Sequence, residues 1–341
     1  MATITQRADH AGKPTYQAKI RKAGFPAQSK TFPTRKEAEA WARSVEESMT
    51  KGGFRSSKLA EVTSMFDLFE AYHDKVSPTK RGGDVEQIRL KVLMASPLAK
   101  YSVKNLTPEV MAKWRDDRLT EVSGSTVGRE LTLIAHVIEK ARKEWGMELA
   151  ENPAHVVSRP KQAPHRERRL RGDEEARLLD AADKTHSKVC PGYLHQAIIL
   201  AVETAMRQAE IAELRWEFIN LKDRVIRLRP TVDFHIKNDS ARTIPLSLRA
   251  VAALTAAGEK TTGQVFKGVT PEGLKRAFIR TTERAEIEDL TFHDLRHEAT
   301  SRLFEKGLNI GEVKQITGHK TMSALERYVH MDVSKIAHRL D

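Results

Sequence analysis

Six side chains in the second half of the chain are of the types needed to cleave a phosphodiester: Arg207, Lys237, His293, Arg296, His319 and Tyr328. A phosphodiester resists attack because its charge repels nucleophiles, and the transition state of phosphoryl transfer carries charge on its equatorial oxygens. Arginine can bind such oxygens through two parallel hydrogen bonds and stays charged at any working pH. We therefore expect Arg207 and Arg296 to hold a scissile phosphate, and His319 to donate a further hydrogen bond to it.

Tyr328 is the expected nucleophile. A phenol has a pKa of about 10 and is mostly protonated at neutral pH, so it needs a base and a positive field. His293 is the candidate base. Tyr328 lies nine residues after His319, whereas the other tyrosines have no cationic neighbours by motif: Tyr16, Tyr72, Tyr101 and Tyr193. Taken alone, Tyr328 would be interpreted as an ordinary core or surface residue.

A helix beginning near Thr291 is expected to position three of the polar side chains. Positions i, i+3 and i+4 share one face of a helix, so His293, Arg296 and His297 project together. Such a face is unusual, because arginine is rarely buried unless it is paired with an anion. The other interpretation is an arginine held by a neighbouring carboxylate such as Asp294.

The remaining candidates fall at the ends of predicted elements. Arg207 begins a helix, and Lys237 ends a strand just before a turn. His319 ends a short helix, and Tyr328 lies on the next one. Three further residues could orient the arginines and histidines, or could equally be plain surface or packing residues: Glu210, Asp294 and His297.

This set resembles the tyrosine recombinase (phage integrase) family, whose catalytic pattern is Arg, Lys, His-x-x-Arg, Gly-His and Tyr. The match runs through residues 169–341, about half of the chain, with all six positions in order. Residues 204–208 and 292–299 are also similar to shufflon-type DNA invertases. Many relatives have Gly where this chain has Ala205, which puts a turn of positive φ at that position in doubt.

The resemblance implies a mainly α fold with small β elements (α+β) and site-specific DNA strand exchange through a covalent 3′-phosphotyrosine. Lys237 would protonate the departing 5′ oxygen as general acid. Because the phosphotyrosine keeps the phosphodiester bond energy, no metal, ATP or other cofactor is expected. The implied active form is a homotetramer on two double-stranded DNA sites, with DNA-bending or directionality proteins as further partners. The tail 332–341 would dock on a neighbouring protomer.

Pattern and composition divide the chain into three domains and a linker. Residues 1–57 are a basic module with a short sheet and one helix, which resembles the arm-type DNA-binding domain of integrases. Residues 60–150 are helical and resemble the core-binding domain of that family. Residues 151–168 form a basic, proline-containing linker, and residues 169–341 form the catalytic domain. The helical and catalytic domains would close as a C-shaped clamp around duplex DNA.

The net charge of +12 is concentrated in two stretches. Residues 1–60 hold 12 Lys/Arg against 5 Asp/Glu, and residues 158–171 hold 6 against 1. Concentrated positive charge indicates a polyanionic partner, although a solvated basic surface, RNA or an anionic membrane would fit composition equally well. The candidate DNA contacts are basic residues of these stretches and of one loop: Lys19, Arg21, Lys22, Lys80, Arg81, Arg159, Lys161, Arg166, Arg168 and Arg169.

Cysteine usage and hydropathy indicate a compartment. Cys190 is the only cysteine, which excludes an internal disulfide and suits a reducing environment. No apolar run reaches about 18 residues, so no membrane span is expected. We expect a cytoplasmic protein of a bacterial host, associated with the nucleoid.

Two other classes of protein fit part of the pattern. A zinc hydrolase could use His293, His297 and His319 as ligands, although Arg296 on the same face would repel a dication. A DNA-binding regulator that has lost catalysis would have no reason to keep Tyr328. Within the recombinase interpretation, integration, excision and shufflon-like inversion all stay open.

Overall fold

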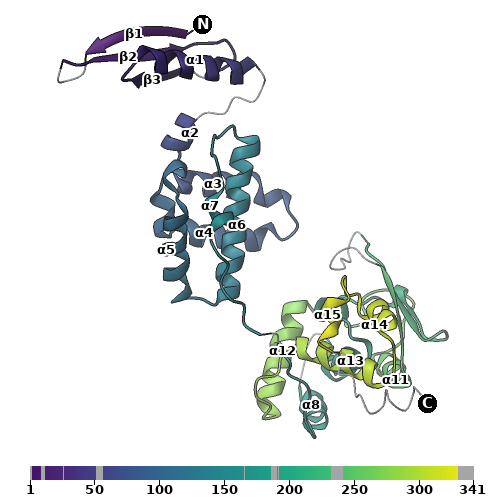
Figure 1. Cartoon of the computed structure of the whole chain (residues 1–341). Helices are drawn as coiled ribbons and strands as arrows, with labels where there is room; N and C mark the ends of the chain where they lie inside the picture. The colour runs from purple at the N-terminus through teal and green to yellow at the C-terminus, as the bar shows by residue number, and fades with distance from the viewer. Residues whose placement is uncertain are drawn as a thin grey trace, which may run out of the picture. The chain divides into compact units, whose positions relative to one another are not determined.

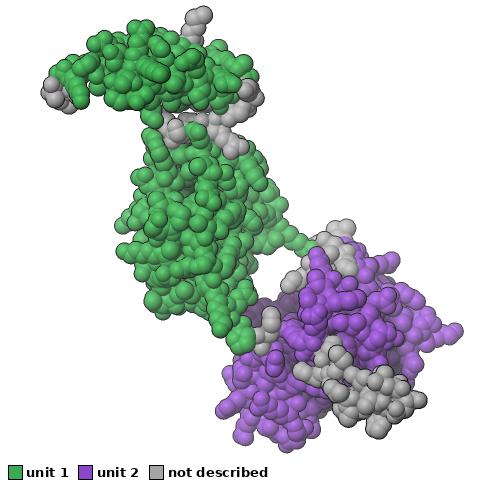
Figure 2. All heavy atoms as spheres, in the orientation of Figure 1, with its two compact units in different colours: residues 1–164 green, residues 165–341 purple. Residues whose placement is uncertain are grey.

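The computed structural model of the protein describes residues 2–8, 12–25, 27–50, 57–164, 166–185, 190, 192–231 and 241–328. Helices predominate there and are accompanied by two small antiparallel sheets, so the predicted mainly α fold with small β elements is confirmed. The chain divides into two compact units, residues 1–164 and 165–341 (Figures 1 and 2). The finer division into three domains and a linker stays a prediction.

The first unit begins with a three-stranded sheet and one helix: β1 (Ala2–Ala8), β2 (Pro14–Ile20), β3 (Gln28–Phe32) and α1 (Arg35–Thr50). The strands pair antiparallel in the order β1-β2-β3. Thr34, just before α1, accepts a hydrogen bond from the backbone nitrogen of Glu37 at 3.3 Å, as side chains at a helix start do. Ile20 of the sheet and Ala42 and Met49 of α1 share a small hydrophobic cluster.

The rest of this unit is helical, with short 3-10 turns between the helices: α2 (Ser57–Val62), α3 (Met65–Lys75), η1 (Ser77–Thr79), α4 (Gly83–Met94), η2 (Pro97–Lys100), η3 (Val103–Asn105), α5 (Pro108–Leu119), α6 (Gly124–Glu144) and α7 (Pro153–Val156). Thr107 caps α5, its side chain accepting from Val110 N, with Pro108 at the first helical position. The apolar face of α6 is buried in a second hydrophobic cluster that includes Leu131 and Ile138.

The second unit carries the remaining elements: α8 (Glu174–Asp183), α9 (Tyr193–Thr204), α10 (Gln208–Ala212), η4 (Trp216–Phe218), β4 (Ile219–Asn220), β5 (Val225–Leu228), β6 (Arg242–Pro245), α11 (Leu248–Ala256), α12 (Pro271–Arg284), α13 (Phe292–Glu305), α14 (Ile310–Thr317) and α15 (Ser323–Glu326). The strands form an antiparallel sheet in the order β4-β5-β6. The strand end and the turn predicted at Lys237 lie outside the described residues.

Helix α13 packs against α9 and α14, and α14 packs against β6. Leu295 and Ala299 of α13 are buried, as its periodicity predicts. The same helix also buries polar side chains, among them Arg296, His297 and Glu298. Buried polar groups need hydrogen-bond partners. These partners come from other elements of the unit, so the polar side chains of α13 gather with them in one site.

Candidate active site

Arg296 is the most deeply buried of the candidate cations that the structure describes, with 3% of its surface exposed. Its guanidinium donates to two backbone carbonyls, those of Ala205 and of Thr317, the latter at 2.6 Å. Burial, together with the neighbouring Arg207 guanidinium, lowers the pKa of Arg296 to about 9, so it remains charged at pH 7. Asp294 does not pair with Arg296, which disposes of the interpretation that this carboxylate neutralises it.

Ala205 supplies one of these carbonyls from an unusual conformation. Its φ of 53° lies in the left-handed region, where α9 ends. The sequence put a positive φ here in doubt, because alanine replaces the glycine of many relatives, yet the turn is present. The conformation costs an L-residue roughly 1–2 kcal/mol. The carbonyl that the turn presents to Arg296 gives that strain a role in the site.

Glu210 joins two arginines through one buried carboxylate, 2% exposed. It accepts from the Arg207 backbone nitrogen at 2.8 Å and from Arg207 Nη1 at 2.9 Å. It also accepts from Arg242 Nη1 at 3.0 Å and Nη2 at 2.6 Å. Burial alone would raise the pKa of Glu210, but Arg242 and Arg207 hold it below its ordinary value. Glu210 therefore orients Arg207, as the sequence interpretation allowed.

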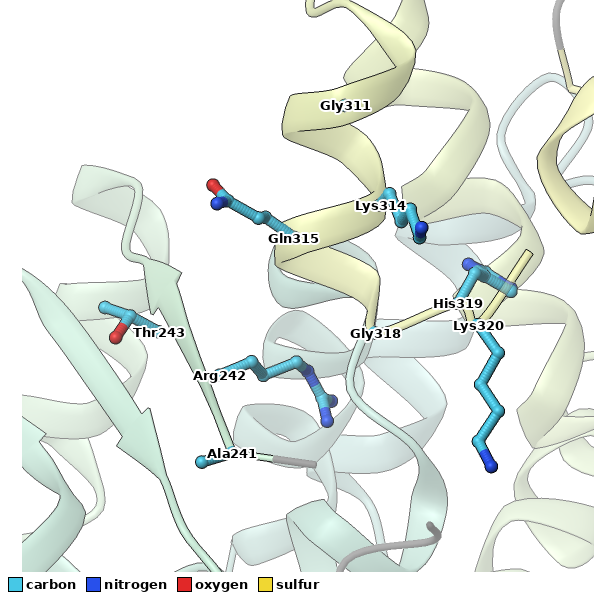
Figure 3. Close-up of a pocket in the computed structure, with 9 residues that line it drawn as sticks. All are labelled: Ala241, Arg242, Thr243, Gly311, Lys314, Gln315, Gly318, His319 and Lys320. Carbon is cyan, nitrogen blue, oxygen red and sulfur yellow. The ribbon is translucent and has the colours of Figure 1, made fainter. Parts of the chain in front are cut away.

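Arg242 is a member of the site that sequence reasoning missed. Its side chain is 6% exposed, and its Nε donates to the Ile316 carbonyl at 3.0 Å. Figure 3 shows Arg242 reaching from β6 toward Gly318, at the end of α14. A Cβ added at Gly318 would lie 3.0 Å from Arg242 Cδ, so the glycine makes this approach possible. No periodicity or motif distinguishes Arg242 among the many basic residues of the chain.

The end of α14 is where the two predicted phosphate-binding arginines converge. Arg296 Nη2 donates to the carbonyl of Thr317 at 2.6 Å, and Arg207 Nη2 to that of Gly318 at 3.5 Å. His319 follows directly, with its Nδ1 2.6 Å from the Thr317 hydroxyl. The structure thus brings Arg207, Arg296 and His319 together at one helix terminus.

The hydrogen-bond network also assigns a tautomer to His319. Burial and the two arginines lower its pKa to about 3, so the ring is neutral at pH 7. The Thr317 hydroxyl donates to the Val313 carbonyl at 2.7 Å and therefore accepts from Nδ1–H of His319. Nε2 of the neutral ring is then an acceptor. His319 was predicted to donate a hydrogen bond to the phosphate, and Nε2 must bind a proton before it can do so.

Tyr328 lies beside these groups with 7% of its surface exposed. Its ring packs with Val313 and Leu325, while its hydroxyl is hydrogen-bonded to Nδ1 of His297 and accepts from Arg327 Nη2 at 2.8 Å. The Tyr328 ring centroid is 5.6 Å from that of His297 and 6.3 Å from that of His319. The hydroxyl therefore faces the polar cluster and not the apolar interior.

The structure places His297, and not His293, against the candidate nucleophile. The His293 ring is 4.8 Å from the His297 ring. Burial is the main cause that lowers the pKa of His297 to about 4, and burial also lowers the pKa of His293. Burial raises the pKa of Tyr328, although the Arg327 guanidinium opposes this. Lys237, the predicted general acid, lies outside the described residues.

Asp294 caps α13 and does not orient an arginine of the site. Its carboxylate accepts from Thr291 N and Thr291 Oγ1, each at 2.8 Å, in a capping box. Arg166 Nε donates to both carboxylate oxygens at 2.9 Å. Burial would raise the pKa of Asp294, but Arg166 and Thr291 keep it below its ordinary value.

Several predicted DNA contacts are engaged within the protein. Arg166 pairs with Asp294 and Asp289, Arg168 with Glu174, Arg169 with Glu298 and Glu305, Lys80 with Glu86, and Arg159 donates to Gly128 O and Thr132. Lys22 donates to Thr50. The side chains of Lys19, Arg21 and Lys161 are exposed, and so is that of Arg81. A cation already paired with a carboxylate adds little net field, so Lys19, Arg21 and Lys161 are better placed to meet a phosphate than the carboxylate-paired Arg166 and Lys80.

A pocket of about 620 Å³ adjoins His319 on the side of β6 and α14 (Figure 3). Arg242, Lys314 and Lys320 contribute to its lining along with His319. Among the described residues, no group of His, Cys, Asp and Glu side chains is arranged to hold a metal ion. That part of the chain also contains no helix with the length and hydropathy of a membrane span.

Comparison with known proteins gives a consistent result. Residues 168–335 match the phage integrase family. The shufflon-specific DNA recombinase of Escherichia coli is 38% identical over 287 residues, covering 82% of this chain and 72% of that protein. A putative integrase/recombinase of Haemophilus influenzae is 32% identical over 336 residues, covering 96% of this chain and 86% of that protein.

Solved structures show the same fold at lower identity. The Tn1549 transposon integrase in complex with circular intermediate DNA superposes with a TM-score of 0.64 at 16% identity, covering 81% of this chain and 98% of that one. A lambda integrase tetramer bound to a Holliday junction gives 0.63 at 17% identity, covering 95% and 94%. The family match, the similar relatives and the shared fold agree, and the chain belongs to the phage integrase family of tyrosine-type site-specific recombinases.

Proposed function

We propose that this recombinase cuts and rejoins duplex DNA with Tyr328 as nucleophile and Arg207 and Arg296 as the phosphate-binding pair. The observation that carries the proposal is the convergence of both guanidiniums on consecutive carbonyls at the end of α14. Among the described residues, the hydrogen-bond acceptors of Arg296 are two backbone carbonyls, and a buried cation of this kind calls for an anion. A scissile phosphate supplies that charge.

The proposed step is a transesterification. Tyr328 Oη attacks phosphorus as its proton leaves, the bond to the 5′ oxygen breaks, and Lys237 protonates that oxygen. Charge that develops on the non-bridging oxygens is bound by the two arginines, and His319 donates once Nε2 is protonated. The phosphate itself favours that protonation, because a nearby negative charge raises the pKa of a histidine. The resulting 3′-phosphotyrosine conserves the bond energy, so religation needs no metal or ATP.

The assignment of the base follows from contact. We predicted His293, and His297 is the ring that is hydrogen-bonded to the Tyr328 hydroxyl. With pKa values held low by burial, both rings are weak bases in the DNA-free protein. The scissile phosphate would raise both, and His293 and His297 together would then share the proton-accepting role.

The DNA interface is proposed on charge and family layout. Residues 1–57 would bind arm-type sites, and residues 60–150 and 169–341 would clamp the core site, with the linker 151–168 along a phosphate backbone. The exposed side chains of Lys19, Arg21 and Lys161, with Lys314 and Lys320 at the pocket of Figure 3, are the best-placed contacts. A homotetramer on two sites is supported by the fold shared with the lambda integrase tetramer on a Holliday junction. The setting would be the bacterial cytoplasm, at the nucleoid.

A shufflon-like invertase is the second candidate, because the Escherichia coli relative carries that name at 38% identity. The chemistry would be the same, and only the arrangement of the DNA sites would differ. Sequencing the DNA that flanks the gene separates the two: inverted repeats on either side of a segment favour inversion, whereas an attachment site favours integration and excision.

Conversion of Tyr328 to Phe tests the proposed reaction. The wild-type protein, incubated with a nicked duplex made from the flanking site, should give a DNA adduct that protease digests and detergent does not remove. Tyr328→Phe should bind the duplex normally and leave no adduct, whereas Tyr101→Phe, at an exposed tyrosine, should behave as wild type. Adduct formation by Tyr328→Phe would refute the assignment.

A further inference from the structure

We propose that Arg327 is a further catalytic residue, which holds the phenolic oxygen of Tyr328 and stabilises the phenolate that attacks phosphorus. The inference rests on the proposed role of Tyr328 as nucleophile and adds a cation dedicated to that oxygen. Arg207 and Arg296 would serve the phosphate, and Arg327 would serve the attacking group.

The contact between the two neighbouring side chains is direct. Arg327 Nη2 donates to Tyr328 Oη at 2.8 Å, and the guanidinium carbon lies 4.8 Å from the centre of the phenol ring. The backbone fixes this arrangement where α15 ends: Arg327 is helical, with φ −63° and ψ −15°, and Tyr328 N donates to Leu325 O at 2.9 Å. One short turn therefore sets the positions of both side chains.

Several arginines of this unit are neutralised by glutamates, whereas no described carboxylate pairs with Arg327. Arg169 and Arg302 both pair with Glu298, for example. Within the described part of the chain, the Tyr328 hydroxyl is the acceptor of Arg327, and its Nε is buried without a hydrogen-bond partner. A cation whose charge is not cancelled by a carboxylate acts in full on the group it touches.

The remaining groups around Tyr328 leave this task to arginine. His297 of α13 and His319 after α14 face the phenol, with pKa values lowered to about 4 and about 3, and so are neutral at pH 7. Burial raises the pKa of Tyr328, and the groups that lower it are Arg327 and, more weakly, Arg296. Arg327 alone of these two has a hydrogen bond to the oxygen.

The chemical step assigns Arg327 no proton to transfer. The Tyr328 O–H bond breaks and its proton passes to a histidine or to solvent. The oxygen–phosphorus bond then forms, and the bond to the 5′ oxygen breaks. Arg327 keeps its charge throughout and lowers the energy of the phenolate, which is the state that is otherwise rare at neutral pH.

The test compares Arg327→Gln and Arg327→Lys in single-turnover adduct formation on the nicked flanking-site duplex, from about pH 6 to pH 9. Gln keeps a donor without the charge, and Lys keeps the charge. Loss of one charge-assisted hydrogen bond predicts a rate about 10- to 100-fold lower for Arg327→Gln at pH 7. The deficit should shrink as pH rises, because hydroxide then makes the phenolate unaided. Arg327→Lys should recover part of the rate.

A second measurement separates electrostatics from packing and needs no DNA. In protein labelled with ¹³Cζ-tyrosine, the Tyr328 signal, assigned by its loss in Tyr328→Phe, should titrate at higher pH in Arg327→Gln than in wild type. Arg276→Gln, at an exposed arginine of α12, is the control that should change nothing. An unmoved Tyr328 titration with a pH-independent loss of rate in both variants, or wild-type rates in Arg327→Gln, would overturn the proposal. A wild-type protein that forms no adduct would instead refute the proposed function.

Discussion

Removal of the Glu210 carboxylate should destabilise the second unit far more than removal of an exposed ion pair nearby. Glu210→Ala leaves Arg242, whose side chain is 6% exposed, without its carboxylate partner. Arg207 loses the same partner and retains its 3.5 Å contact with Gly318 O. Stranding a buried charge in this way costs about 3–5 kcal/mol. Arg276→Ala breaks an exposed pair with Glu272, in which the two side chains are 70% and 59% exposed, and should cost about 1 kcal/mol or less.

The assay can be confined to the second unit. Trp216 lies in it and is 4% exposed, whereas Trp41, Trp114 and Trp145 belong to residues 1–164. In a background with those three converted to Phe, fluorescence of Trp216 during urea unfolding reports the second unit alone. Each variant is compared with this background, so the free energy of unfolding is measured for the unit that contains Glu210.

A double-mutant cycle gives the refutation. Glu210→Ala should cost several kcal/mol because it strands Arg242, whereas Arg242→Ala should cost less because Glu210 keeps its pair with Arg207. The double variant should cost less than the sum of the two single variants. We expect a coupling above about 1.5 kcal/mol. Additivity within about 0.5 kcal/mol would show that the two side chains do not depend on one another. The shared Glu210 carboxylate would then no longer explain how Arg207 is held.

The same pair predicts a direction with pH. The pKa of Glu210 in the folded protein lies below its ordinary value of 4.5, so the carboxylate contributes stability at neutral pH that is lost as pH falls. The stability difference between wild type and Glu210→Gln should therefore be largest above about pH 5 and shrink below it. A difference that grew on acidification would contradict the charge pairing.

Three further outcomes follow from the site. Gly318→Ala should lower the free energy of unfolding by about 1–2 kcal/mol and slow adduct formation, because Gly318 has a φ of 69° and its added Cβ would press on Arg242. Gly258→Ala is the control, because Gly258 also has a positive φ but open space around it. This variant should lower stability and leave the reaction unchanged. Arg166→Ala should destabilise the second unit by about 1–3 kcal/mol, since it leaves the buried Asp294 carboxylate with Thr291 as its remaining partner, and wild-type urea midpoints would contradict this. Adduct formation should persist in excess EDTA, and loss of the adduct with recovery on adding Zn²⁺ would contradict the metal-free mechanism. DNA cleavage that needs Zn²⁺ and leaves no adduct would favour the zinc-hydrolase alternative built on His293, His297 and His319.

Local patterns predicted the elements that carry the site. Helical spacing placed His293, Arg296 and His297 on one face, and the helix that carries them begins at Thr291 as predicted. These predictions succeeded because the physical causes, side-chain periodicity and unsatisfied backbone groups at helix ends, act over a few residues.

Pairings between distant residues were beyond such patterns. Arg242 and Glu210 are 32 positions apart, and Arg166 and Asp294 are 128 apart. The tertiary fold determines which arginine pairs with which carboxylate. A single sequence therefore does not show that Arg166 is paired with a carboxylate and that Lys161 is exposed. The positive φ of Ala205 is likewise imposed by packing against its residue preference.

The Asp294 carboxylate is shared, and this has a thermodynamic consequence. Arg166, from the first residues of the second unit, and Thr291, from the start of α13, donate to the same side chain. A DNA phosphate that bound Arg166 would compete with Asp294 for this guanidinium. Binding free energies are reciprocal, so if phosphate binding to Arg166 destabilises the start of α13, destabilising the start of α13 strengthens that binding by the same free energy. Contact of Arg166 with the DNA backbone and the positions of His293 and Arg296 on α13 would then be coupled through one equilibrium.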